Sequence, residues 1–298
     1  MKQIAIISGK GGTGKTTVTA AFAELAEAMI VADCDVEAPN LHLVLDHKVK
    51  KETEYVGNQT ARIDYLLCSH CRRCEEVCRY EAITEKVQVG EGIRPDEFFP
   101  FIDSKRCEGC AACVYACPTQ AIKLYPEGTG KVFLSETAVG DFAHAELYLA
   151  ADGSGKLVAE VRRLARDEAR RQNKSVLIDG SPGIGCVVIS TITGCQQVIV
   201  VTEPSQSGKH DLERVIKLTG HFKIPTDVII NKWDINLEVS QEIEELCLKL
   251  GVAVIGRIPF DPMVPQAIAL GHPITRYECP AAEALRVIWG NLLLENEH

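Results

Sequence analysis

The chain has 298 residues, of which 46% are hydrophobic and 24% charged, the composition of a globular protein rather than a disordered or fibrous one. Its net charge of −9 and pI of about 5.5 argue against nucleic acid as the main partner. Because no apolar run approaches the roughly 18 residues of a membrane span and no signal pattern opens the chain, we expect a cytoplasmic protein without a membrane partner.

Short β-branched runs alternate with longer segments of helical character along most of the chain. The predicted strands cover residues 3–8, 29–33, 176–179, 197–202, 226–231 and 253–258. The predicted helices cover residues 15–27, 156–172, 211–221 and 239–250. Continuous apolar strands separated by helices indicate a parallel sheet that is covered on both faces. The predicted fold class is therefore α/β, with a doubly wound, mostly parallel sheet.

A glycine-rich loop follows the first predicted strand and precedes the first predicted helix. It reads Gly9-Lys10-Gly11-Gly12-Thr13-Gly14-Lys15-Thr16-Thr17. This matches the phosphate-binding pattern G-x-x-x-x-G-K-[ST] of P-loop nucleotide hydrolases, in the strand–loop–helix context that supports it. Backbone N–H groups of such a loop surround phosphate oxygens, and the helix N-terminus adds a positive partial charge. We expect Lys15 to reach the β and γ phosphates of ATP and Thr16 to bind Mg²⁺.

The alternation of strands and helices stops after Asn40 and resumes near Gly153. Within this stretch the segment that begins at residue 63 recurs from residue 102, an offset of 39 positions. Such a repeat indicates a small unit made of two similar halves. We predict a P-loop domain at residues 1–56 and 131–298, with an inserted α+β domain at 57–130. The turn between its halves is predicted at Gly90, Gly92, Pro95 and Pro100.

Thirteen cysteines are many for a cytoplasmic protein, in which clustered cysteines bind metal more often than they form disulfides. Eight of them form two runs with the same spacing, C-x₂-C-x₂-C-x₃-C. The first run is Cys68, Cys71, Cys74 and Cys78, and the second is Cys107, Cys110, Cys113 and Cys117. This is the run of bacterial two-cluster ferredoxins, in which the fourth cysteine ligates the other cluster.

We therefore expect the insert to be ferredoxin-like and to hold two [4Fe–4S] clusters through crossed sets of cysteines. Cluster 1 takes Cys68, Cys71, Cys74 and Cys117, and cluster 2 takes Cys78, Cys107, Cys110 and Cys113. Zinc is the alternative metal, although it prefers paired C-x₂-C units separated by longer loops. The remaining cysteines are expected to be core residues, since free cysteine behaves as a small hydrophobe. They are Cys34, Cys186, Cys195, Cys247 and Cys279.

The two runs differ in the residues between their cysteines. The first contains His70, Arg72 and Arg73, whereas the second contains small residues such as Gly109 and Ala111. Positive charge near cluster 1 favours its reduced form. The two reduction potentials are therefore expected to differ.

The early lysine of the phosphate loop, Lys10, separates it from the commonest P-loops. With this lysine the chain resembles the MinD/Mrp-type ATPases, the deviant Walker A group that also contains ParA and the nitrogenase iron protein. The resemblance covers residues 1–45 and 150–298. It implies an ATP-promoted homodimer in which Lys10 reaches the nucleotide held by the partner subunit.

The resemblance also implies roles for individual residues. Asp35, in Ala32-Asp33-Cys34-Asp35, corresponds to the aspartate of the first switch that orients water, and Asp179 corresponds to the aspartate of the second switch that holds Mg²⁺ through water. Asn231, Lys232 and Pro259 lie where the family contacts adenine. The candidate catalytic residues are Lys10, Lys15 and Asp35. The candidate Mg²⁺ ligands are Thr16, Asp35 and Asp179.

The position of the insert after the first switch suggests ATP-gated electron transfer to a partner redox protein or metallocofactor, because switches move between nucleotide states. A second hypothesis is an ATPase that assembles or delivers a metal cluster. Spatial organisation, as in MinD or ParA, is disfavoured by the acidic C-terminal residues and the overall charge. An amidotransferase-type ligase related to cobyrinic acid synthases is a further alternative, but no glutaminase domain is recognisable. A paralogous ATPase is another candidate partner.

Overall fold

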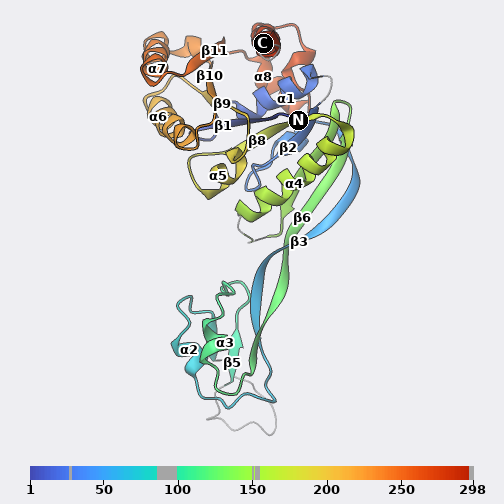
Figure 1. Ribbon diagram of the computed structural model, residues 1–298, viewed down its shortest axis with the longest axis vertical. Coiled ribbons are helices and arrows are strands. Elements are labelled where there is room, and N and C mark those ends of the chain that lie inside the picture. The colour runs from blue at the N-terminus through green and yellow to red at the C-terminus, as the bar shows by residue number, and fades with distance from the viewer. Residues whose placement is uncertain (27–28, 86–98, 150, 152–154, 295–298) are drawn as a thin grey trace. The chain divides into compact units, whose positions relative to one another are not determined.

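The computed structural model describes residues 1–26, 29–85, 99–149, 151 and 155–294 (Figure 1). The predicted turn residues Gly90, Gly92 and Pro95, the predicted helix end at Glu27 and the acidic residues 295–298 lie outside this part. The chain forms two compact units. Unit 1 comprises Met1–Thr53, Lys131–Leu147 and Asp152–His298, and unit 2 comprises Glu54–Gly130 and Tyr148–Ala151.

Unit 1 is built on one large sheet. Its parallel strands are β1 (Gln3–Ser8), β2 (Met29–Asp33), β7 (Gly140–Leu147), β8 (Ser175–Pro182), β9 (Gln197–Thr202), β10 (Thr226–Asn231) and β11 (Ala253–Ile258). Two further strands, β3 (His47–Ile63) and β6 (Ile122–Thr137), continue into unit 2. In the described residues the strand order is β11-β10-β9-β1-β8-β2-β7-β6-β3. The predicted α/β fold with a mostly parallel sheet is confirmed.

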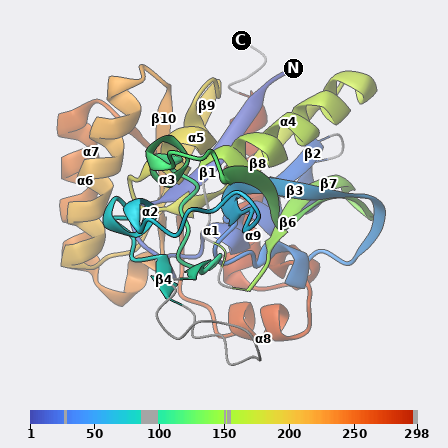
Figure 2. The same ribbon diagram turned by 90° about the horizontal axis from the view of Figure 1, so that it is seen from below.

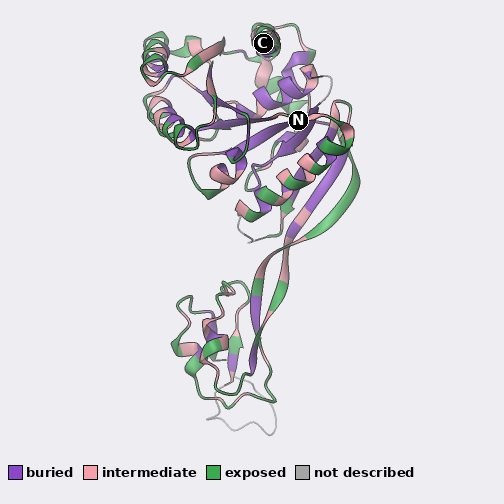
Figure 3. Ribbon diagram, in the orientation of Figure 1, coloured by how far each residue is buried: buried purple, intermediate pink, exposed green. Residues whose placement is uncertain are grey.

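Helices cover both faces of this sheet, so its central strands are buried along their length (Figure 3). α1 (Lys15–Leu25) packs against α9 (Pro280–Leu294), with the rings of Phe22 and Trp289 5.0 Å apart. α4 (Gly155–Gln172) and α5 (Cys186–Ile192) pack together on the other face (Figure 1). α6 (Gln206–His221) and α7 (Leu237–Leu250) lie side by side (Figure 2). The short helices are η1 (Leu41–Leu43), η2 (Trp233–Ile235), α8 (Met263–Ala269) and η3 (Ile274–Arg276). No described helix has the length and apolar character to cross a membrane.

The predicted elements of unit 1 differ from the observed ones mainly at their ends. α6 begins at Gln206, five residues before the predicted start, because the hydroxyl of Ser205 accepts a hydrogen bond from the N–H of Gly208 and caps the helix. β7 has no predicted counterpart. It carries Asp141 and His144 among its buried residues, and these polar residues interrupt the apolar run by which a buried strand is recognised.

Unit 2 contains the cysteine repeat. Its elements are α2 (Arg73–Glu76), α3 (Ala112–Ala116) and the antiparallel pair β4 (Ile83–Glu85) and β5 (Pro100–Ile102), so Pro100 begins a strand rather than lying in the predicted turn. The two halves exchange equivalent backbone hydrogen bonds. The N–H of Asp64 donates to the carbonyl of Ala121 at 2.7 Å, and that of Asp103 to the carbonyl of Ala82 at 2.8 Å. Residues of both halves therefore build one small core.

The cysteine loops of the two halves have the same backbone conformation. The φ angle is positive at three matched pairs, His70 and Gly109, Arg72 and Ala111, and Glu81 and Gln120. Residues other than glycine adopt a positive φ at a cost in free energy. Its recurrence at equivalent positions shows that both loops are held to one shape.

Candidate functional site

The phosphate loop connects β1 to α1 at the carboxyl edge of the sheet. Gly12 and Gly14 have φ angles of 78° and 93°, a conformation that glycine adopts readily. A Cβ atom on Gly14 would collide with the amide of Asn231, which donates a hydrogen bond to the carbonyl of Thr13 at 2.8 Å. Glycine at position 14 therefore lets the loop close against the end of β10.

A groove of about 980 Å³ opens beside this loop, a size typical of small-molecule sites. It is lined by residues 11–17, by Asp35 after β2, and by Asn231 and Lys232 after β10. In the described structure, the hydroxyl of Thr13 is buried without a protein partner, as expected of a group that a ligand satisfies. Phe260, in the segment around Pro259 that resembles a base-contacting loop of the family, also lines the groove and offers an aromatic face.

The predicted Mg²⁺ ligands meet around the ammonium group of Lys15. Its Nζ lies 3.0 Å from Oδ1 of Asp179 and 3.3 Å from Oδ2 of Asp35. The hydroxyls of Thr16 and Thr19 donate to the two oxygens of Asp179 at 2.8 and 2.9 Å. Burial opposes the charge of Lys15, but attraction to Asp179 and Asp35 outweighs burial and raises its pKa. The loop thus holds a buried cation and two carboxylates next to the groove.

Asp33 is a buried residue that holds the backbone of the segment carrying Asp35. Its carboxylate accepts hydrogen bonds from the N–H groups of Asp35 at 3.0 Å and Leu41 at 3.2 Å. Burial, together with the nearby charge of Asp179, raises the pKa of Asp33 to about 8. Burial also raises the pKa of Asp35. Asp33 therefore fixes the segment that presents Asp35.

Lys10 lies apart from the residues that line the groove. Its Nζ is 2.7 Å from Oε1 of Glu203, 3.0 Å from the hydroxyl of Ser205 and 3.1 Å from that of Ser207. Lys232 binds the other oxygen of Glu203 at 3.2 Å. These contacts hold Lys10 against the start of α6, so it must leave Glu203 to reach a second subunit.

Three other predicted residues also stay outside the lining of the groove, Gly9, Asp179 and Pro259. Gly9 faces Asp211 of α6 so closely that a Cβ atom there would collide with the Asp211 side chain. Its role is therefore to let the phosphate loop pass this helix.

The eight clustered cysteines of unit 2 line two pockets. Pocket 1 is lined by Cys68, Cys71, Cys74 and Cys117. Pocket 2 is lined by Cys78, Cys107, Cys110 and Cys113. Each pocket thus combines three cysteines of one run with the fourth cysteine of the other.

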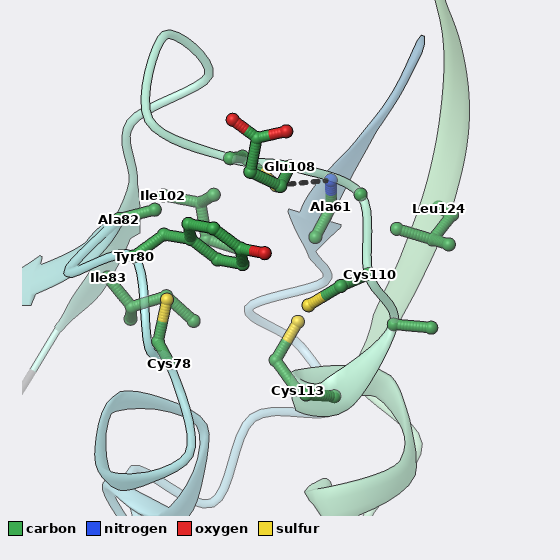
Figure 4. Close-up of a pocket in the computed structure, with 14 residues that line it drawn as sticks. Ala61, Cys78, Tyr80, Ala82, Ile83, Ile102, Glu108, Cys110, Cys113 and Leu124 are labelled. Atoms are coloured by element: carbon green, nitrogen blue, oxygen red, sulfur yellow. Dashed lines mark hydrogen bonds between the residues drawn. The ribbon is translucent and has the colours of Figure 1, made fainter. Parts of the chain in front are cut away.

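The sulfur atoms of Cys78, Cys110 and Cys113 turn into pocket 2 (Figure 4). One cysteine of each pocket is deeply buried, Cys74 at 8% exposure and Cys113 at 9%. Burial raises the pKa of Cys113 to about 11, so its thiol keeps its proton at neutral pH.

Pocket 1 supplies hydrogen bonds to its sulfur atoms. The N–H of Ala121 donates to the sulfur of Cys117 at 3.2 Å. Bonds from the backbone of Arg73 and the side chain of Ser69 lower the pKa of Cys71. In pocket 2 the N–H of Ala61 donates to Cys107 at 3.5 Å. Each pocket therefore offers a backbone N–H donor to a cysteine sulfur.

The donor set and backbone of each pocket fit a [4Fe–4S] cluster. Residues of positive φ stand between the cysteines of both loops, and such residues are typical of the concave backbone turns found at many iron–sulfur sites. Among the described residues, no three His, Cys, Asp or Glu side chains are placed to hold a single metal ion. A [4Fe–4S] cubane needs a different arrangement from a single ion, because each thiolate binds a separate iron. The four cysteine sulfurs therefore lie around the cluster and not around one point.

Of the five remaining cysteines, Cys34, Cys195 and Cys247 are buried as expected, and Cys279 is partly buried. The prediction is wrong for Cys186. It is exposed because it begins α5 beside the groove, which it helps to line.

Most of the chain matches a known family of nucleotide-binding domains. The family model of the CobQ/CobB/MinD/ParA nucleotide-binding domain matches residues 4–274. The chain is 32% identical over 271 residues to an uncharacterised protein of Methanocaldococcus jannaschii, covering 90% of this chain and 87% of the relative. It is 24% identical over 306 residues to the iron–sulfur cluster carrier protein of Pyrococcus furiosus, covering 96% and 83%.

Solved structures agree on the fold. MinD of Pyrococcus horikoshii complexed with Mg-ADP matches with a TM-score of 0.57 at 19% identity, over 100% of this chain and 98% of that one. The cell division ATPase MinD of P. furiosus gives the same TM-score at 18% identity, over 99% of each chain. The match over residues 4–274, in a chain whose phosphate loop closes on a groove of suitable size, shows that this protein belongs to the CobQ/CobB/MinD/ParA family of nucleotide-binding proteins.

Proposed function

We propose that the protein hydrolyses ATP, carries two [4Fe–4S] clusters, and uses the nucleotide to gate electron transfer from the clusters to a partner redox protein or metallocofactor. The observation that carries the proposal is the pair of four-cysteine pockets in a chain of a nucleotide-binding family. Unit 2 is then the inserted ferredoxin-like domain, predicted at residues 57–130, and unit 1 is the P-loop domain.

In the nucleotide site, residues 11–17 surround the phosphates and Lys15 turns from its carboxylates to a phosphate oxygen. Thr16 and Asp179, already joined by a hydrogen bond, would hold Mg²⁺. When bound, this ion offsets the charge that develops on the phosphate oxygens. Asp35 orients the attacking water, and the amide of Asn231 with the ring of Phe260 receives the base.

The chain itself connects the nucleotide to the clusters. Asp35 precedes η1, and β3 begins shortly afterwards at His47 and continues into unit 2. Switch segments change position when the γ-phosphate leaves. A displacement that begins at Asp35 therefore passes along β3 to the cysteine unit.

Cluster delivery is the second candidate, favoured by relatives named iron–sulfur cluster carrier proteins in three Pyrococcus species. The burial of Cys74 and Cys113, and the use of both halves by each pocket, support resident clusters instead, since release requires unit 2 to open. Loaded protein mixed with an apo-ferredoxin and ATP separates the two functions. Retention of iron on this chain supports electron transfer, and its movement to the acceptor supports delivery.

Metal content is the direct test of the cluster proposal. Anaerobically purified protein is expected to contain about eight iron and eight sulfide per chain, because two cubanes hold four irons each. It should also show charge-transfer absorption in the visible range and hydrolyse ATP. Zinc in place of iron, without visible absorption, would contradict the proposal.

Dimerisation gives a test of Lys10. Glu203 holds Lys10 in the single chain, so Glu203→Gln is expected to strengthen ATP-promoted dimerisation. The dimerisation constant should rise by up to about fivefold, which corresponds to the free energy of a partly exposed ion pair. Analytical ultracentrifugation with a non-hydrolysable ATP analogue measures the change, and Lys10→Ala should abolish dimerisation.

Glu242→Gln is the matched control for this experiment. It breaks the 2.9 Å ion pair between Lys209 of α6 and Glu242 of α7, which does not involve Lys10. Equal dimerisation of the two glutamine variants would show that Glu203 does not restrain Lys10.

A further inference from the structure

The two pockets of unit 2 have matched cysteines but different surroundings. Five pairs of lining residues at equivalent positions, offset by 39, differ between them. With the residue of pocket 1 first, the pairs are Ser69 and Glu108, His70 and Gly109, Arg72 and Ala111, Pro100 and Ala61, and Thr119 and Tyr80. Because positive φ angles recur at matched positions of the two halves, the difference between the sites lies mainly in these side chains.

Pocket 1 offers hydroxyl donors to its sulfur atoms. The hydroxyl of Thr119 lies 3.6 Å from the sulfur of Cys117, and Ser69 lines the same pocket two residues before Cys71. A cysteine bound to iron has lost its proton, so the hydroxyl must be the donor. Donors to sulfur stabilise the extra negative charge of a reduced cluster and raise its potential.

Pocket 2 has no hydroxyl of this kind at the matched positions. Glu108 is an acceptor with a negative charge, and its carboxylate turns away from the labelled sulfur atoms (Figure 4). Tyr80 lines the pocket with its aromatic ring, and among the described residues no hydrogen bond joins its hydroxyl to a cysteine sulfur. Both residues therefore leave the sulfurs of pocket 2 with less stabilisation in the reduced state.

The exposure of the cysteines is closely matched. Cys74 and Cys113 are 8% and 9% exposed, and Cys71 and Cys110 are both exposed. Backbone donors act in the same direction as the hydroxyls, because the N–H of Ala121 lies 3.2 Å from the sulfur of Cys117 in pocket 1 and the N–H of Ala61 lies 3.5 Å from that of Cys107 in pocket 2. Solvent access thus does not separate the two sites.

The charge of Arg72 acts in the same direction as the hydroxyls but less strongly. Its guanidinium is 3.2 Å from the carboxylate of Glu85 and 3.9 Å from that of Glu75. These exposed acids offset much of its field at the pocket. The two hydroxyls are therefore the main determinants.

We propose that the cluster of pocket 1 has the higher reduction potential, and that Ser69 and Thr119 set this order. The inference rests on the proposed function, because it requires both clusters. One electron from a low-potential one-electron donor then reduces cluster 1, the donor being oxidised by one electron, and a second electron is needed for cluster 2. An electron that enters at pocket 2 moves to pocket 1, which oxidises cluster 2 again.

The test is a redox titration of the full chain, with dithionite as reductant and electron paramagnetic resonance as readout. Wild-type protein should show two one-electron steps. Ser69→Ala and Thr119→Ala should each lower the equilibrium constant of the higher step by roughly tenfold, or about 59 mV, and leave the lower step in place. Ser104→Ala, which removes an exposed hydroxyl of unit 2, is the control and should move neither step.

A reciprocal variant tests the same cause in the other pocket. Glu108→Ser with Tyr80→Thr places hydroxyls at the matched positions of pocket 2 and should raise the lower step toward the higher one. Coincident steps in the wild type, or a shift of the lower step in Ser69→Ala, would overturn the inference. Iron analysis of each sample distinguishes failure of the proposed function from failure of this inference. Protein without iron would overturn both. Iron-loaded protein with coincident steps would overturn only the proposed order of potentials.

Discussion

Replacement of Lys15 by alanine is expected to weaken ATP binding by roughly a hundredfold to a thousandfold, and with it to abolish hydrolysis. Lys15 is 6% exposed and neutralises Asp179 and Asp35, which are 0% and 8% exposed. Loss of one partner of a buried ion pair costs about 3–5 kcal/mol, because the other charge is left uncompensated. Here the uncompensated carboxylates also repel the phosphates. Isothermal titration calorimetry with Mg-ATP measures the loss.

The same substitution should lower the thermal unfolding temperature, which shows how far the effect is structural. Lys209→Ala is the control, because it removes a lysine whose ion pair with Glu242 lies at the surface. It should leave both binding and unfolding temperature close to those of the parent. Parental ATP affinity in Lys15→Ala would show that the groove beside the phosphate loop is not the nucleotide site.

The second large effect is expected from the crossed cysteine sets. Cys78→Ser should reduce the iron content from about eight to about four per chain, because pocket 2 loses its ligand from the first half. Combining Cys78→Ser with Cys107→Ser should remove no further iron, since both side chains line pocket 2. Combining it with Cys68→Ser should remove nearly all iron, since Cys68 lines pocket 1.

If each cluster took all four cysteines of one run, the results of the two double variants would be exchanged. Comparing the two double variants therefore shows which cysteines share a cluster. Cys279→Ser serves as control, because this partly buried cysteine lies in unit 1. It should retain about eight irons, the content of two intact clusters. The measurement is iron and sulfide analysis of anaerobically prepared protein.

The parts of the structure that were predictable are those in which neighbouring residues carry the signal. The phosphate loop is a strand, a loop and a helix in direct succession, and the parallel strands read as uninterrupted apolar runs. The membership of the MinD-type family, predicted from Lys10 and the two switch segments, is confirmed. The roles of Lys10, Asp35 and Asp179 remain predictions.

Contacts between distant segments were not predictable from these patterns. Lys10 forms an ion pair with Glu203, which is far away in the sequence. The sequence around neither residue carries a pattern that predicts this contact. β7 was missed because His144 replaces an apolar residue in its interior. The structure satisfies this histidine with a 3.0 Å hydrogen bond to Ser135 and stacks its ring on Phe142 at 4.5 Å.

The place of unit 2 within unit 1 imposes an order on biosynthesis. All eight clustered cysteines are made before Asp179, which pairs with Lys15, and before Asn231, which lines the groove. Domains generally fold as units while synthesis proceeds at about 5–20 residues per second. Cys117 is the last of the clustered cysteines to be synthesised. Pocket 1 is therefore incomplete until Cys117 is made, even though the other three cysteines of the pocket come from the first half. On the ribosome the cysteine unit can therefore close while the chain is still unable to hold a nucleotide.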